Sequence, residues 1–235
     1  MDSGATMPWM QHVSMPSSAL SPASPPVSAA DRAHRYVRER ILSGEIAGAA
    51  MITEGEIAEA AGVSRTPVRE AFLRLQAEGL LALHPKRGAL VQPIAPGEAD
   101  DVFELRELIE AHAARRIAAR PAVERTALVA DLRPLVAEQS AAVAADDLPA
   151  YAILDARMHQ GIIDAGGNAL IGEIGRTVRD RQVRLTAGTV RRSPARARAF
   201  IAEHARLLDH LEAGDAAAYA DALARHLAGA REVLA

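Results

Sequence analysis

The chain has 235 residues and a net charge of −3; 49% of the residues are hydrophobic and 3% are aromatic. Abundant alanine with few aromatic residues favours closely packed helices over a β-sandwich. Cysteine is absent, which excludes disulfides, thiolate zinc sites and cysteine nucleophiles. The sequence also lacks the run of about 18 apolar residues that a membrane helix needs, so we expect a cytoplasmic protein with no membrane partner.

The first 30 residues are rich in serine, proline and methionine. They contain no apolar stretch flanked by positive charge, so they do not have the pattern of a signal peptide. Their composition predicts a disordered segment over residues 1–30.

Two short helices are predicted next. Residues 31–44 carry apolar side chains at helical spacing and stop at a glycine. Thr53 with Glu56 three residues later forms a capping-box pattern, and Gly62 is placed to end this second helix.

A third helix and a hairpin follow. Ser64 is placed to cap the helix and Gly79 to end it. Residues 80–93 contain two short apolar runs on either side of a basic turn, which indicates a β-hairpin. Helix, helix, turn, helix and hairpin predict a winged helix-turn-helix over residues 31–95. The apolar stripe of its third helix consists of Val68, Ala71, Phe72 and Leu75.

The third helix has the side chains needed to bind DNA. Arg65 and Arg69 lie one turn apart near its N-terminus, the part that enters the major groove in a helix-turn-helix. Arginine can donate two hydrogen bonds to guanine. Two arginines alone favour a solvated helix face, but the capped helix and glycine turn before them and the basic hairpin after them reverse this in favour of DNA binding. Phosphate contacts are predicted from Ser64, Thr66 and Arg74, and contacts of the wing with the adjacent minor groove or backbone from Lys86 and Arg87.

The run GVSRTPVREA, followed by RLQAEGLL and PKRGALV, resembles the DNA-binding domain of the GntR family of bacterial transcription regulators. The resemblance covers about 65 residues. It implies base and phosphate contacts from Arg65, Thr66 and Arg69, and a wing contact at Gly88. Some relatives carry a DNA-contacting polar side chain early in the second helix, where this chain has Gly55, so that contact is in doubt here.

Residues 96–235 show helical periodicity only, after a linker marked by Pro93, Pro96 and Gly97. The predicted fold class is therefore mostly α: a winged helix-turn-helix of three helices and a hairpin, then an all-α antiparallel bundle. The predicted bundle helices are 98–119, 122–145 (disturbed at Pro134), 148–165, 168–188, 194–212 and 216–233.

Four side chains of the bundle form a candidate metal site. Asp155 and His159 are four residues apart on one helix face, a spacing that lets both bind one cation. His204 and His226 each lie on an apolar stripe, on two helices that a glycine turn makes antiparallel neighbours. The residues themselves leave two interpretations open, a divalent metal site or a set of hydrogen-bonded core histidines.

The same half resembles the FCD effector-binding domain of FadR-like GntR regulators, through LRELIE (105–110), DARMHQ (155–160), GGNALI (166–171), AEHARLLDHL (202–211) and ARHLAGA (224–230). The resemblance implies that Asp155, His159, His204 and His226 hold a divalent ion, with zinc or nickel favoured. It also implies a small organic acid as effector, with its carboxylate at open positions of the metal.

Two further residues are candidates for effector binding. Arg106 can pair with a carboxylate of the effector or with Glu110, four residues on. Asn168 can cap its helix or contact the effector.

Together these features predict a homodimeric transcription regulator, with a repressor favoured over an activator. It would bind a pseudo-palindromic operator and respond to a small carboxylate. Two alternatives remain: the same regulator with a metal-free pocket for an apolar effector, or a metal-dependent hydrolase using the same four ligands. Against the hydrolase, no second carboxylate is clearly placed as a general base, so we predict that the protein is not an enzyme.

Overall fold

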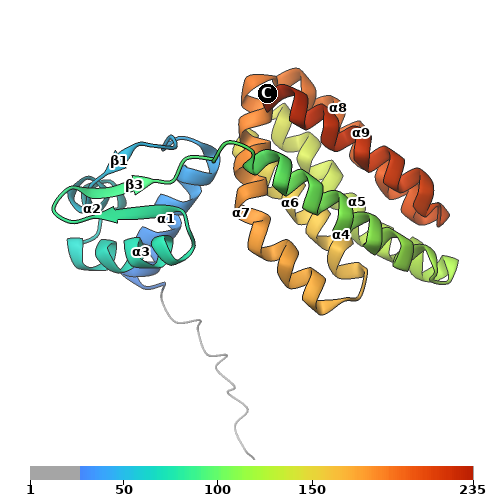
Figure 1. Cartoon of the computed structure of the whole chain (residues 1–235), viewed down its shortest axis with the longest axis horizontal. Helices are drawn as coiled ribbons and strands as arrows, with labels where there is room; N and C mark the ends of the chain where they lie inside the picture. The colour runs from blue at the N-terminus through green and yellow to red at the C-terminus, as the bar shows by residue number, and fades with distance from the viewer. Residues whose placement is uncertain (1–26, 235) are drawn as a thin grey trace, which may run out of the picture.

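The computed structural model describes residues 27–234, which form a winged domain and a helical bundle joined by one linker (Figure 1). The mostly α fold predicted from the sequence is confirmed. The predicted disordered segment lies almost wholly outside the described residues, but its last two residues do not fit the prediction. Ala29 and Ala30 belong to the first helix, because Ser28 accepts a hydrogen bond from the Asp31 amide and so caps the helix earlier.

Within the described part, the winged domain has three helices and three strands. These are α1 (Ala29–Ser43), β1 (Met51–Ile52), α2 (Glu54–Ala61), α3 (Arg65–Ala77), β2 (Leu81–His84) and β3 (Gly88–Val91). The predicted capping box is present, since Thr53 and Glu56 exchange hydrogen bonds at the start of α2. Ser64 occupies the N-cap position of α3, but its side chain makes no capping hydrogen bond, contrary to prediction.

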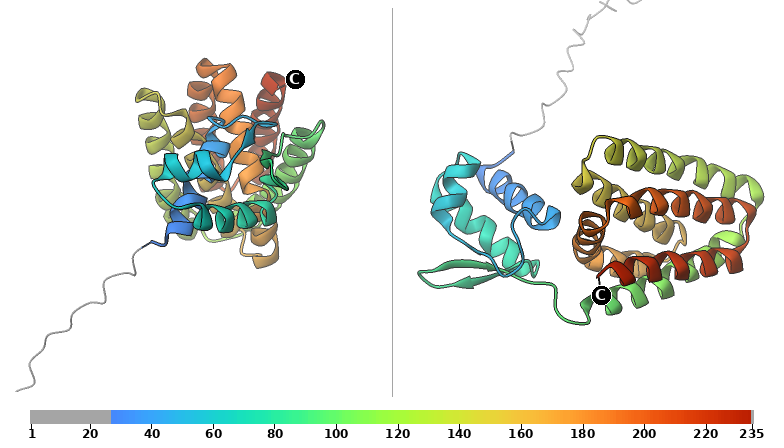
Figure 2. Two further views of the ribbon diagram at one scale, coloured as in Figure 1. Left: turned by 90° about the vertical axis from the view of Figure 1, so that its left-hand side faces the viewer. Right: turned by 90° about the horizontal axis from the view of Figure 1, so that it is seen from above.

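The strands form an antiparallel sheet in the order β1-β3-β2. The predicted hairpin β2–β3 is present, and its tip points away from the bundle (Figure 2). Strand β1 was not predicted, because two residues are too short to show an alternating pattern. Gly88 allows this third strand to pair. A Cβ atom there would lie 2.3 Å from the Ile52 carbonyl oxygen, and its φ of 113° also favours glycine.

The bundle contains six helices in the described residues, as predicted. They are α4 (Glu98–Ala118), α5 (Ala122–Ala144), α6 (Leu148–Ala165), α7 (Ala169–Arg192), α8 (Pro194–Ala213) and α9 (Ala216–Leu234). Pro134 lies inside α5 without ending it. Helix α7 continues past the predicted end at residue 188 to Arg192, and its C-cap Ser193 directly precedes the proline that starts α8.

The two domains share apolar packing. Ala152 and Ala156 of α6, with Val183 and Ala187 of α7, belong to the same buried cluster as the core of the winged domain. Arg191 of α7 donates to the carbonyl oxygen of Ser43 at 3.3 Å across the same boundary. Helix α7 is therefore the face that the bundle presents to the winged domain (Figure 1).

Among the helices of the described chain, none combines the length and apolar character needed to cross a membrane.

Candidate nucleic-acid interface and metal centre

The predicted DNA-contacting residues gather on one side of the winged domain. Arg65, Arg69, Lys86 and Arg87 line a groove of about 650 Å³ between α3 and the hairpin, with Gly88 at its edge. Ser64 and Thr66 are exposed at the N-terminus of α3. This grouping provides guanidinium groups, an ammonium group and the positive end of a helix on a single surface.

Arg69 is held by a residue of the neighbouring helix. Its Nε and Nη2 atoms donate to the two carboxylate oxygens of Glu54 at 2.8 and 3.0 Å. The Arg69 side chain remains 70% exposed, so the pair lies in water where exchange for a phosphate or a base is inexpensive.

Arg65 approaches the backbone of α2 at Gly55. A Cβ atom at Gly55 would lie 3.4 Å from Arg65 Nη2, so the glycine leaves room for this guanidinium group. Arg74, by contrast, forms a 2.6 Å ion pair with Asp31 of α1 and does not line the groove. Arg65 and Arg69 therefore share one groove with the basic residues of the wing, whereas Arg74 faces α1.

The second site lies inside the bundle, where α6, α8 and α9 meet. One ligand atom each from Asp155, His159, His204 and His226 lies within 4.8 Å of the others, and all four residues are buried. The imidazole rings of His204 and His226 are 4.8 Å apart, which confirms that the last two helices bring their inward histidines together.

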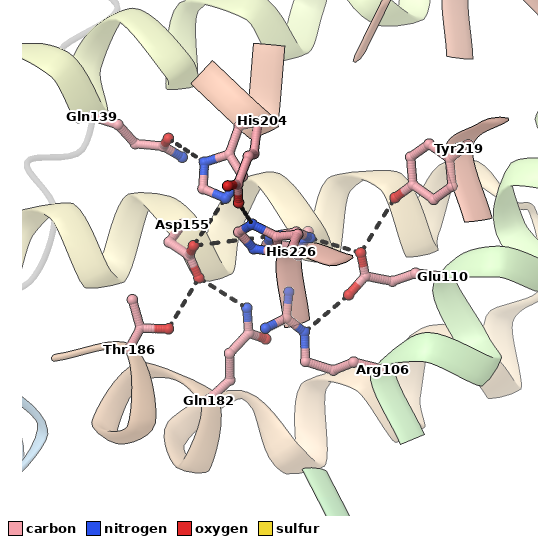
Figure 3. A network of polar contacts seen from close by, with 11 residues as sticks. Arg106, Glu110, Gln139, Asp155, Gln182, Thr186, His204, Tyr219 and His226 are labelled. Atoms are coloured by element: carbon pink, nitrogen blue, oxygen red, sulfur yellow. Dashed lines mark hydrogen bonds and ion pairs between the residues drawn. The ribbon is translucent and has the colours of Figure 1, made fainter. Parts of the chain in front are cut away.

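Each histidine is oriented by a partner on its outer nitrogen. The Nδ1 atoms of the three histidines donate to Glu110 at 2.7 Å from His159, to Gln139 at 2.7 Å from His204 and to Glu203 at 2.8 Å from His226 (Figure 3). The Nε2 atoms of His159 and His204 are buried and have no hydrogen-bond partner. A hydrogen bond on one ring nitrogen leaves the lone pair on the other, so these rings are set to bind an ion between them.

Asp155 is oriented in the same way. Its Oδ2 atom accepts hydrogen bonds from Gln182 and Thr186 of α7, both at 3.2 Å. Its Oδ1 atom faces the histidines and lies 3.3 Å from His204 Nε2. Three imidazole nitrogens and one carboxylate oxygen fit a divalent transition ion, and buried Nε2 atoms without partners are what such an ion would satisfy.

The electrostatics support this arrangement. Burial lowers the pKa of His204 to about 4, with His226 adding to the shift, and burial also lowers the pKa of His226. Both rings are therefore neutral near pH 7, which is the form that binds a metal. Burial works to raise the pKa of Glu110, but the charges and hydrogen bonds of His159 and Arg106 outweigh it and lower the pKa to about 2.

Of the two roles considered for Arg106, the structure shows the pair with Glu110. Its Nε atom donates to Glu110 at 3.0 Å, while its Nη2 atom is buried without a partner. A cavity of about 10 Å³ lies beside it, lined also by Asp155 and His226. Such a volume holds roughly one water molecule, so a larger ligand requires the helices to part.

Asn168 does not line the cavity beside Arg106. Its side chain accepts hydrogen bonds from the amides of Leu170 and Ile171 and caps α7, and it is not among the residues lining the cavity. Its observed contacts are those of a helix cap, so the prediction of an effector contact at Asn168 gains no support.

Sequence reasoning missed the residues that orient the candidate metal ligands. Glu110 was considered only as a partner of Arg106. A signal existed in each case, a polar residue at an inward position of an otherwise apolar helix face. The residues missed in this role are Glu110, Gln139, Gln182, Thr186 and Glu203.

A winged helix-turn-helix with an arginine-lined groove, followed by a helical bundle, defines a DNA-binding transcription regulator. The comparisons agree. Residues 101–229 match the FCD domain, and residues 29–91 match the model described as bacterial regulatory proteins, gntR family. The chain belongs to the GntR family and carries an FCD domain, as its motifs predicted.

Similar proteins are named as transcription regulators. An HTH-type transcriptional regulator in an unstable DNA locus of Streptomyces ambofaciens is 34% identical over 199 residues, covering 81% of this chain and 78% of the relative. Another, in the TAR-I ttuE-ttuC' intergenic region of Agrobacterium vitis, is 34% identical over 140 residues, 58% of this chain and 82% of the relative. The solved structure of E. coli McbR/YncC superposes with a TM-score of 0.70 at 22% identity, covering 88% of this chain and 97% of that one, which supports the fold.

Proposed function

We propose that this regulator is a cytoplasmic repressor whose affinity for its operator is controlled by a small organic acid bound at a divalent metal in the bundle. The observation that carries the proposal is the buried cluster of Asp155, His159, His204 and His226, in which every ligand is oriented by a second residue. A merely structural histidine cluster has no need to leave two buried Nε2 atoms without a hydrogen bond, facing the Asp155 carboxylate at 3.9 Å from His159 and 3.3 Å from His204.

At the DNA, Arg65, Thr66 and Arg69 would enter the major groove, with Arg69 exchanging Glu54 for a base or phosphate. Lys86, Arg87 and the backbone at Gly88 would contact the neighbouring backbone or minor groove. The uncommitted hydroxyl of Ser64 suits a phosphate at the start of α3, and Arg74 would reach a phosphate only after leaving Asp31. A homodimer would place two such helices about 34 Å apart, matching the half-sites of a pseudo-palindromic operator.

In the bundle, the ligand set of three nitrogens and one oxygen suits zinc or nickel. When bound, the ion would supply open positions for a carboxylate. Arg106 would bind the same carboxylate through its unpaired Nη2 atom while Glu110 holds the rest of its guanidinium group. Since the adjacent cavity holds only about one water, the acid would have to displace the surrounding helices.

The route from this site to the DNA follows α6 and α7. Asp155 lies on α6, and the Gln182 and Thr186 side chains that hold it lie on α7. Other faces of the same helices carry Ala156 and Val183 into the core of the winged domain. A displacement at Asp155 would therefore tilt the winged domain, and a coupling of about 1–3 kcal/mol per site would suffice for regulation.

The test is DNA binding by the purified full-length chain to the promoter fragment of its own locus, with zinc, with nickel and after chelation, each in the presence of candidate acids. The proposal predicts specific binding of a dimer and release by an acid only in the metal-loaded protein. Absence of specific binding under all conditions would refute the proposal that the protein regulates its own locus. Release from DNA of the metal-free protein by an apolar compound would favour the metal-free alternative.

We propose no catalytic role. Glu110 and Glu203, the carboxylates nearest the histidines apart from Asp155, are both hydrogen-bonded to histidine Nδ1 atoms on the outer side of the rings. Neither is placed to act as the general base of a metal-dependent hydrolase.

A further inference from the structure

A groove of about 930 Å³ lies between the winged domain and the bundle. One wall consists of residues 76–82, the end of α3 and the first part of β2. The other wall is the stretch of α7 between Arg176 and Arg184, and the linker closes one end. Its volume is that of a small-molecule site.

The groove is lined by five arginines, Arg38, Arg176, Arg179, Arg181 and Arg184, and by three acidic residues, Glu78, Glu98 and Asp180. Three of the arginines are neutralised: Arg38 pairs with Asp180, Arg176 with Asp164 and Arg181 with Glu98. Glu78 is occupied by His34. Within residues 27–234, Arg179 and Arg184 make no ion pair with any carboxylate, so two positive charges of the groove are left over.

Of these two arginines, Arg184 is partly buried and makes a hydrogen bond across the groove. Its Nη2 atom donates to the carbonyl oxygen of Gln92 at 2.6 Å, and within residues 27–234 its guanidinium group makes no other hydrogen bond. Burial lowers its pKa, with Arg181 adding to the shift against the opposing charges of Glu98 and Asp180. A partly buried guanidinium group that is matched only by a backbone carbonyl has lost water without gaining a counter-charge.

We infer that this groove is a binding site for a small multiply charged anion, carrying phosphate or carboxylate groups, that Arg179 and Arg184 hold between the two domains. Guanidinium groups match both kinds of anion with paired hydrogen bonds. The groove also offers the side-chain amides of Gln76 and Gln92 as uncharged donors.

The site is separate from the metal cluster. Gln182 and Thr186 of α7 reach into the bundle to Asp155, whereas Arg179 and Arg184 of the same helix line the groove. An anion bound there would tie α7 to the end of α3 and to the linker. It would therefore favour one orientation of the winged domain, as an input independent of the metal.

The experiment is isothermal titration calorimetry on the full-length protein after chelation and dialysis, so that metal complexation cannot contribute. Pyrophosphate and citrate are the two probes, because they separate phosphate from carboxylate recognition. We expect saturable binding of at least one probe. Arg179→Gln and Arg184→Gln should each weaken it about tenfold, since each removes a charge-assisted hydrogen bond.

Arg191→Gln is the matched control. Arg191 also reaches from α7 to a main-chain oxygen of the winged domain, but it does not line the groove. Binding should be unchanged in this variant. Arg184→Gln also removes a hydrogen bond between the domains. Arg179 makes no side-chain hydrogen bond or ion pair within the described residues, so Arg179→Gln keeps the test decisive if Arg184→Gln folds poorly.

Lack of binding by both probes to the wild-type chain would overturn the inference. So would binding that Arg179→Gln leaves intact in a protein with wild-type thermal stability. Binding of pyrophosphate alone would assign the site to phosphates, and of citrate alone to polycarboxylates. Neither result depends on whether the metal cluster controls the operator, so this inference and the proposed function fail separately.

Discussion

The winged domain and the bundle hold their functional side chains in opposite surroundings. Around α3, arginines lie in water and are paired with acids that a phosphate can replace, as Arg69 is with Glu54. In the bundle, Asp155 and the three histidines are buried, and each is fixed by a hydrogen bond to a further residue. The first arrangement suits an interface that forms and separates, and the second suits a site that binds a small ion in one geometry.

The largest effect on stability is expected from removing a buried charge from the bundle. Glu110→Ala would leave the buried Arg106 guanidinium and the His159 ring without their partner. Breaking a buried pair from one side costs about 3–5 kcal/mol, so we expect a loss of that size in urea unfolding of metal-free protein. Glu107→Ala, an exposed substitution on the same helix, should have little effect. Equal stability of the two variants would show that the buried contacts of Glu110 do not stabilise the fold.

Gln139→Leu tests the orientation of a single ligand. The substitution removes the acceptor for His204 Nδ1 without touching the Nε2 atom that faces the cluster. Loss of such a partner lowers metal affinity by about 10- to 100-fold. Competition with a chromogenic chelator would measure the change, with the exposed neighbour Glu138→Gln as control. An unchanged affinity would mean that the ring needs no support.

Arg65→Ala probes the exposed surface. Loss of an arginine that reads a base should weaken operator binding by about 1–3 kcal/mol and relax specificity at one position. Fluorescence anisotropy on wild-type and single-base-changed operators would show both effects. A uniform loss on all sequences would instead place Arg65 on a phosphate.

Glu54→Gln should have the smallest effect and the opposite sign. The substitution frees Arg69 from its carboxylate, and since the pair is exposed we expect almost no change in Tm. Affinity for unrelated DNA should rise a few-fold, because one negative charge beside the groove is gone. A fall in affinity would show that Glu54 positions Arg69 for DNA rather than competing with it.

The two regions also differ in how far the sequence predicts them. The turn at Gly62, the stripe from Val68 to Leu75 and the basic hairpin tip lie close together in the chain, so local pattern was enough for the winged domain apart from β1. The four candidate metal ligands could be predicted because helical spacing turns each of them inward.

What could not be predicted depends on contacts between distant helices. Glu110 is 49 residues from His159, and Gln139 is 65 residues from His204. Helical periodicity places each of these side chains inward, but it does not say which helix lies opposite. The same limit applies to the groove between the domains, because Arg184 of α7 meets Gln92 only once α7 has packed on the winged domain.

The most direct test of the central claim is metal analysis of the untagged full-length protein beside two double variants, His204→Ala His226→Ala and the control His112→Ala His210→Ala, whose histidines lie outside the cluster. We predict about one divalent ion per chain in the wild type and the control, and none in the cluster variant. An ion retained by the cluster variant, or none in a wild-type protein incubated with zinc and nickel, would contradict the metal centre.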